Sequence, residues 1–178
     1  MDKRGYNIGH SRQIIPSIAN MIERCRELGV RVFFVRGENS SATTSETWEN
    51  RPSARNDGSL GFRLIEPGTW GAQIVDELNP LPSEHVVVKT RYSAFVNTEL
   101  PMLLRNGGIK NVIITGATTN ACVDTSVRDA FVMDFNVSVA SDCVASPEPE
   151  LHEASLKSIA KYFGRVNNSK EILQDLSS

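Results

Sequence analysis

The sequence predicts an α/β fold in which helices cover both faces of a parallel sheet. Short apolar segments typical of strands alternate along the chain with segments whose apolar residues recur at helical spacing. The 178 residues, 40% of them hydrophobic, are enough for one full core, and no repeat or low-complexity tract marks a second domain. We therefore expect a single domain over residues 1–178, built as a three-layer, doubly wound parallel sheet.

The first half of the chain is predicted to begin with a helix and a buried strand. Apolar residues at helical spacing, Cys25 among them, predict a core-facing helix over 13–28, which Gly29 ends. The continuous apolar run Val30–Val35 is typical of a strand that is buried on both faces. The polar segment Glu38–Glu66 lacks periodicity and is expected to be a long excursion over the surface, of the kind that often carries function.

The rest of the chain continues the alternation of helices and short strands. Helical segments are predicted at 67–78, at 97–105, after Cys122 and at 149–163. Short apolar strands are predicted at 86–88, 111–115 and 136–140, with a weak last strand at 164–166. Because each helix lies between two strands, neighbouring strands should run parallel.

One irregularity concerns the start of the sheet. Folds of this type normally open on a strand that becomes a central one, whereas this sequence opens on a helix. Without that strand, two unpaired strand edges would lie inside the protein, which is costly. We therefore expect the first strand to be missing, through a shortened gene model, an alternative start or processing.

Composition excludes several classes of protein. A net charge of -2 argues against binding to nucleic acid or to an anionic membrane surface. No apolar run is long enough to span a bilayer, and the N-terminus lacks the apolar stretch of a secretory signal. Three scattered cysteines do not form a disulfide framework, which favours a reducing, cytoplasmic setting.

The strongest functional signal is Cys122, which follows the strand 111–115 at the point where Gly116 begins a turn into a helix. A thiol in the first turn of a helix experiences the positive end of the helix dipole, which favours the thiolate. The unpaired N–H groups of the same turn can stabilise a developing oxyanion. The alternative is that Cys122 is a small buried hydrophobic residue, as free cysteines commonly are.

Lys89 ends the strand 86–88, as Cys122 follows the strand 111–115. Because the carboxyl ends of parallel strands form the usual site of such folds, the two side chains can face one crevice. There the ammonium group could stabilise a thiolate or protonate a leaving amine. A solvated lysine at a strand end is the competing interpretation.

Other chemistries find little support in the sequence. It has no glycine-rich nucleotide-binding motif and no Cys-x-x-Cys pair. The isolated histidines His10, His85 and His152 lack metal-ligand spacing. Surface roles are expected for His85, in a turn before a strand, and for His152, at a polar helix start. Asp142 and Cys143, at the end of the fourth strand, are expected to cap a helix and to pack, respectively. The sequence therefore predicts no metal and no cofactor.

Two long motifs make the chain similar to a known family. Gly116–Val123 followed by Ser126–Phe131 closely resembles the nucleophile motif of isochorismatase-like cysteine hydrolases, and Lys89–Thr98 resembles their catalytic-lysine segment. Pro67–Gly71 and Asp142–Ser146 match secondary landmarks of the same family. The resemblance covers essentially the whole chain in the right order.

The resemblance implies a six-stranded parallel sheet and an Asp–Lys–Cys triad that hydrolyses amide-type C–N bonds. By position, Cys122 is the nucleophile and Lys89 assists in charge and proton handling. The Ala117–Thr118 peptide aligns with a non-proline cis bond of the family, which would aim the N–H of Thr118, with that of Cys122, at the oxyanion. Isochorismatase itself lacks the cysteine, so Cys122 points to the amidohydrolases. Candidate pocket residues are Trp70, Tyr92 and Asn120.

The sequence departs from the family in two places. In the family, the triad Asp lies at the end of the opening strand, and this sequence has no matching stretch. Asp2 is not a substitute, because it aligns with residues that follow the triad Asp. Nicotinamidases of the family carry a histidine metal cluster where this chain has Arg36–Ser40, so that metal site is not supported. The sequence of the segment Arg91–Phe95 is closer to that of the ureidoacrylate amidohydrolases, one branch of the family. The resemblance thus implies a metal-free homo-oligomer acting on a small amide or ureido compound.

A second hypothesis follows from the missing Asp. Without it the base that takes the proton from Cys122 is absent, and general-base assistance contributes on the order of 10²–10⁴ in rate. The chain would then be a catalytically impaired, truncated form or a regulatory partner of intact subunits.

Overall fold

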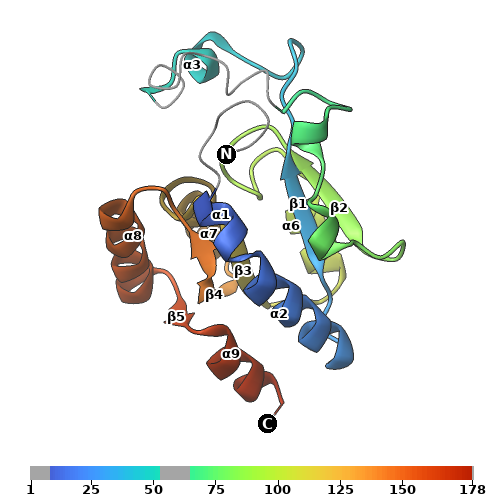
Figure 1. Cartoon of the computed structure of the whole chain (residues 1–178), viewed down its shortest axis with the longest axis vertical. Helices are drawn as coiled ribbons and strands as arrows, with labels where there is room; N and C mark the ends of the chain where they lie inside the picture. The colour runs from blue at the N-terminus through green and yellow to red at the C-terminus, as the bar shows by residue number, and fades with distance from the viewer. Residues whose placement is uncertain (1–8, 53–64, 178) are drawn as a thin grey trace.

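The computed structural model describes residues 9–52 and 65–177, and in it helices and parallel strands alternate along the chain (Figure 1). β1 (Phe33–Gly37) pairs with β2 (His85–Lys89), while β4 (Asn136–Ala145) lies between β3 (Asn111–Ala117) and β5 (Arg165–Asn167). All three pairings are parallel, which confirms the α/β class. Residues 53–64 of the expected surface excursion, and Asp2, lie outside the described residues.

The described strands form two hydrogen-bonded sheets and not one continuous sheet. One has the order β1–β2 and the other the order β3–β4–β5. Within the described ranges, β1 and β3 therefore each have a strand partner on one side only. Lys89 ends a strand of the first sheet and Cys122 follows a strand of the second, so packing between the sheets decides whether the two side chains meet.

Seven α-helices and three shorter helical turns are placed in the described residues. The α-helices are α1 (Gly9–Gln13), α2 (Ile15–Glu27), α3 (Glu46–Glu49), α6 (Leu100–Asn106), α7 (Asp124–Val132), α8 (Pro149–Tyr162) and α9 (Ser169–Leu176). Two 3₁₀ turns, η1 (Trp70–Ala72) and η2 (Asp76–Leu78), precede β2, and a π-helical turn, η3 (Thr119–Val123), leads into α7. Within the described part, every helix is too short or too polar to cross a bilayer.

The core lies on both faces of the larger sheet. Val137 and Val139 of β4 belong to a cluster with residues of α6, α7 and α8, whereas Ala140 of the same strand packs with α2 and α9. This alternation places helices on both faces, which gives three layers. Val87 of β2 belongs to the same cluster as Val139, so the larger core joins the two sheets. Cys25 is buried in the smaller cluster, as predicted.

Several elements near the site differ from their predictions. Strand β1 begins at Phe33, where pairing with β2 begins, and only Phe34 is fully buried. Phe33 and Val35, on the opposite face, pack against the larger core cluster but are only partly buried, so burial of the strand is less complete than predicted. The helix predicted over 67–78 is replaced by η1 and η2, because Gln73 and Val75 between them are extended.

The helix predicted from residue 97 begins only at Leu100. Asn97 has a left-handed backbone (φ 56), which is incompatible with a helix, and a proline occupies the first helical turn. Strand β4 runs five residues beyond its predicted end, to Ala145. Cys143 is fully buried in it, and Asp142 accepts hydrogen bonds from the backbone N–H and the hydroxyl of Ser169 at the start of α9, so both predictions are confirmed.

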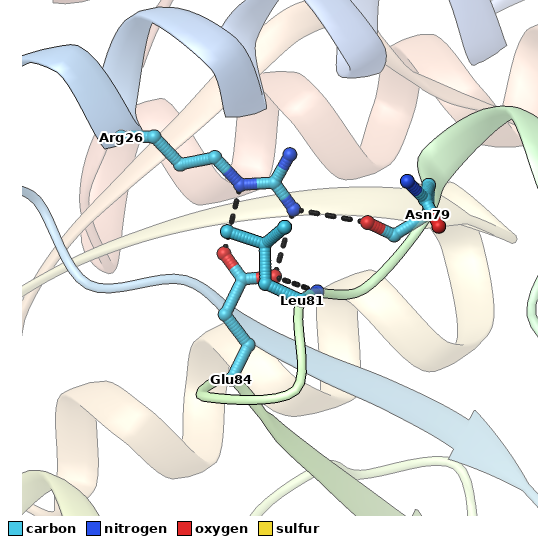
Figure 2. Close-up of polar contacts among 4 residues, drawn as sticks. All are labelled: Arg26, Asn79, Leu81 and Glu84. Carbon is cyan, nitrogen blue, oxygen red and sulfur yellow. Dashed lines mark hydrogen bonds and ion pairs between the residues drawn. The ribbon is translucent and has the colours of Figure 1, made fainter.

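An ion pair fastens α2 to the turn that precedes β2 (Figure 2). Arg26 donates from Nε and Nη2 to the two carboxylate oxygens of Glu84, at 2.8 and 2.7 Å, and from Nη2 to the carbonyl of Asn79 at 3.1 Å. Glu84 also accepts from the backbone N–H of Leu81 at 2.8 Å. The hydrogen bonds from Arg26 hold the pKa of Glu84 below its usual range. This two-pronged contact stabilises the position of β2 against the helical layer.

Replacing Glu84 by Gln should lower the free energy of unfolding at pH 7 by about 1–2 kcal/mol. The reason is that the bidentate ion pair with Arg26 and the hydrogen bond from the Leu81 N–H are both weakened. Since the folded-state pKa of Glu84 is depressed, this contribution is present above its unfolded pKa and is lost as the pH falls through the folded value. The difference between the two proteins in urea unfolding should therefore shrink as the pH falls through the folded-state pKa of Glu84, and should vanish below it. Glu77→Gln, which breaks an exposed pair with Arg12, is the matched control and should change little.

Candidate active site

Lys89 and Cys122 meet between the two sheets. Lys89 is the last residue of β2, and Cys122 lies in η3, just beyond the end of β3. Lys89 Nζ donates to Cys122 Sγ at 3.3 Å. Both residues are half-buried, so Lys89 is not simply solvated and Cys122 is not sealed in the core.

The ammonium group of Lys89 is held in place by the chain that follows it. Besides the sulfur, Nζ donates to the carbonyl oxygens of Arg91 at 2.8 Å and of Tyr92 at 2.9 Å. Three acceptors match the three N–H donors of an ammonium group. The side chain is therefore oriented by the backbone turn after β2.

The segment that carries Cys122 turns sharply from strand to helix. Strand β3 ends at Ala117, the Ala117–Thr118 peptide bond is cis, and the π-helical turn Thr119–Val123 continues directly into α7. Cys122 thus lies in the first turn of a helical segment, where backbone N–H groups lack helical acceptors. π-Helical turns of this kind occur frequently at functional sites.

Ser126 joins the turn that carries Cys122 to the segment that follows Lys89, a role that the sequence analysis missed. Its hydroxyl donates to the carbonyl of Cys122 at 2.6 Å and accepts from the backbone N–H of Ala94 at 2.9 Å. Ser126 and Ala94 are both buried, so neither polar group has ready access to water. The only available signal was a serine on the inner face of the helix after Cys122.

Two further side chains, from other elements, hold the turn that carries Cys122. His152, in the first turn of α8, places Nδ1 2.9 Å from the hydroxyl of Thr119, which is fully buried. Ser146, just after β4, donates to the side-chain carbonyl of Asn120 at 2.8 Å. The predicted surface role of His152 is therefore wrong, because α8 packs against η3. Neither partner lies near the turn in the sequence, so no local pattern indicated them.

The other candidate residues from the sequence analysis lie in different environments. The ring of Tyr92 meets the indole of Trp48 edge-on, with centroids 4.7 Å apart. Asn120 is engaged by Ser146, as described above. Trp70 begins η1 and is 60% exposed. His85 is exposed and stacks on a phenylalanine ring of β1.

The chain's three cysteines lie in different environments. Burial raises the pKa of the Cys25 thiol, and burial with the nearby charge of Asp142 raises that of Cys143 to about 12. Cys122 alone is beside an ammonium group among the described residues. No group of three or more histidine, cysteine, aspartate or glutamate side chains that could hold a metal ion occurs in the ranges 9–52 and 65–177.

Comparison with known proteins agrees with this geometry. The Isochorismatase domain model matches residues 2–171. The chain is 31% identical over 176 residues to the ureidoacrylate amidohydrolase RutB of Agrobacterium fabrum, covering 93% of this chain and 77% of the relative.

Solved structures with the same fold are also similar to this chain. An isochorismatase family protein from Desulfovibrio vulgaris superposes with a TM-score of 0.85 at 25% identity, over 100% of this chain and 92% of the other. The N-carbamoylsarcosine amidase of Thermoplasma acidophilum superposes with a TM-score of 0.73 at 25% identity, over 89% and 84%.

The parallel α/β fold agrees with that of the family's solved structures, and the match of the domain model over residues 2–171 shows the class of protein. The chain belongs to the isochorismatase family, and it is a hydrolase of that family.

Removing the Ser126 hydroxyl should destabilise the protein more than an ordinary surface change. Ser126→Ala leaves the buried N–H of Ala94 without its acceptor, so the free energy of unfolding should fall by about 1–3 kcal/mol in urea denaturation. Ser177→Ala removes an exposed hydroxyl that also donates to a carbonyl, and it should cost less than about 0.5 kcal/mol. Equal losses in the two variants would show that Ser126 does not link the segments.

Proposed function

We propose that the protein is a metal-independent cysteine hydrolase that cleaves a C–N bond of a small amide or ureido compound. The observation that carries this proposal is the 3.3 Å contact between Lys89 Nζ and Cys122 Sγ at the carboxyl ends of the strands. An ammonium group at this distance attracts a thiolate more strongly than it attracts a thiol. The names of two relatives, a ureidoacrylate amidohydrolase and an N-carbamoylsarcosine amidase, support the class of substrate.

The proposed reaction has two stages. The sulfur of Cys122 attacks the carbonyl carbon, and backbone N–H groups of Thr118 and Cys122 stabilise the resulting oxyanion. The C–N bond then breaks as Lys89 gives a proton to the leaving nitrogen, which leaves an acyl group on sulfur. Water adds its hydroxyl to that acyl group and returns a proton to Lys89, releasing the acid and the thiolate.

A second candidate is a catalytically impaired or regulatory chain that assembles with intact subunits. It is favoured by the hydrogen bonds of the site, in which no described carboxylate contacts Lys89 or Cys122. The family resemblance assigns that carboxylate to an opening strand, and β1 and β3 are among the described strands with a partner on one side only. In the first candidate such an Asp, supplied between the sheets, takes the proton from Cys122.

We also propose that the protein is one hydrolase domain that acts in the cytoplasm as a homo-oligomer. Its free cysteines support a reducing compartment. A hollow at the amino ends of β3 and β4, opposite the site, is lined by the exposed side chains of Phe131, Val132 and Tyr162, and such an apolar surface suits a contact between copies.

Iodoacetamide at neutral pH should alkylate Cys122 well before the other two thiols. Burial disfavours the thiolates of Cys25 and Cys143, whereas Cys122 is accessible and lies beside Lys89. Peptide mass spectrometry over a time course measures the order of labelling. Equal, slow labelling at all three positions would support the impaired chain.

Measurements of turnover in two variants test the roles of Cys122 and Lys89 separately. Ammonia release from ureido and amide compounds should be abolished in Cys122→Ser and reduced by on the order of 10² or more in Lys89→Ala. Lys110→Ala, which alters an exposed lysine before β3, is the control and should retain the original rate. Release that persists in Cys122→Ser would remove the cysteine from the mechanism.

A further inference from the structure

The ends of α7 and α8, two helices that pack against each other, hold large apolar side chains in contact with solvent. Phe131 and Val132, at the end of α7, are 47% and 75% exposed, and Tyr162, the last residue of α8, is 59% exposed. Single exposed apolar residues are ordinary on protein surfaces, whereas a group of them marks a site of interaction.

The aromatic members of this group are held in place by one another. The ring of Phe163 meets that of Phe131 edge-on, with centroids 5.7 Å apart, and its centroid lies 6.1 Å from that of Tyr162. The guanidinium carbon of Arg128 lies 4.4 Å from the centroid of Phe163. Side chains that are already ordered lose little conformational entropy when a partner binds, and aromatic residues are enriched at the centres of protein interfaces.

The same side chains border the hollow at the amino ends of β3 and β4, which has a volume of about 730 Å³. Phe135 and Val137, both buried, also line it, so its surface is apolar in part. Val132 is the most exposed apolar side chain around the hollow. An exposed apolar side chain beside an apolar hollow is a shape that a second copy of the same surface can match about a two-fold axis.

Charges of both signs also line the hollow. They belong to Asp134, in the turn before β4, to Lys161, in the last turn of α8, and to Arg165, the first residue of β5. All three are exposed, and none takes part in an ion pair in the described part of the chain. A two-fold axis brings the acidic group of one copy to the basic groups of the other, whereas a partner with charges of one sign would meet like charges on this surface.

We propose that the hollow is the interface of a symmetric dimer of this chain. Val132 of each copy packs into the hollow of the other, and Asp134 of each copy contacts Lys161 and Arg165 of the other. This inference rests on the proposed homo-oligomer and deepens it, because it assigns the face through which the copies join. α8 lies on the side of the molecule away from β2, which ends at Lys89, so the dimer leaves the site open to small molecules (Figure 1).

Val132→Asp tests the apolar contact. The new carboxylate would be buried without a partner in the dimer, so the dimer Kd should rise about a hundredfold or more. Sedimentation equilibrium of the full chain over a range of concentrations measures this Kd, and thermal unfolding checks that the variant is folded. Met102→Asp is the matched control, because Met102 is a 55% exposed apolar residue of α6 outside the hollow, and it should leave the Kd unchanged.

Charge reversal tests the polar contacts and the symmetry together. Asp134→Lys, and separately the double variant Lys161→Glu, Arg165→Glu, should each raise the dimer Kd about tenfold or more, since like charges then meet across the interface. An equimolar mixture of the two variants should form a heterodimer, because each acidic group of one variant then faces basic groups of the other. Native mass spectrometry separates the three possible dimers. Lys170→Glu, which alters an exposed lysine of α9 outside the hollow, is the control and should dimerise like the original protein.

The outcomes separate this proposal from the proposed function. A dimer that Val132→Asp leaves intact, or charge variants that do not pair in the mixture, would overturn this interface while the homo-oligomer stands; a chain that is monomeric throughout the concentration range would overturn both. Asp134 has a left-handed backbone (φ 66), so if Asp134→Lys fails to fold, Asp134→Asn suits that backbone and should still raise the Kd. Alkylation of Cys122 should be unchanged in Val132→Asp, so the hydrolase and the interface can fail independently.

Discussion

The site depends on how two separate sheets are held against each other. Lys89 belongs to the β1–β2 sheet and Cys122 follows a strand of the β3–β4–β5 sheet, yet their side chains are in contact. No strand pairing in the described residues joins the sheets, so side-chain packing must set the distance. A displacement of about 1 Å between reacting groups can cost two orders of magnitude in rate.

Two kinds of contact supply that packing. The larger core cluster contains Val87 of β2 together with Val139 of β4, which joins the sheets through apolar contact. The ion pair of Arg26 and Glu84 ties the turn before β2 to α2, and α2 in turn packs on β4. Apolar burial supplies most of the free energy, while the directional ion pair limits sliding of one sheet relative to the other.

The turn that carries Cys122 is restrained by polar contacts from three other elements. Ser126 links it to the lysine segment, His152 reaches it from α8, and Ser146 reaches it from the end of β4. Fully paired buried polar groups favour one conformation of the backbone. The turn can therefore present the sulfur of Cys122 without help from a ligand.

Local patterns in the sequence predicted most of the elements well, and the errors have different causes. The helix α8 and the strand β5 were placed within one residue of their limits, because periodicity and a helix-starting proline are local signals. Helix α9 was missed although Asn168 and Glu171 form a capping box at its start. The helix expected over 67–78 failed because Gln73 and Val75 are extended and η2 packs against α2 as a separate turn.

The sequence by itself indicated the candidate reactive residues and determined what class of fold presents them. A cysteine after one strand and a lysine after another are local features, and the family motifs around them are contiguous. Only the tertiary structure decided that these groups touch, that His152 holds the turn, and that exposed side chains of α7 and α8 line one hollow. Lys89 and Cys122 are 33 residues apart, as are Thr119 and His152, and such contacts form only when separate elements pack.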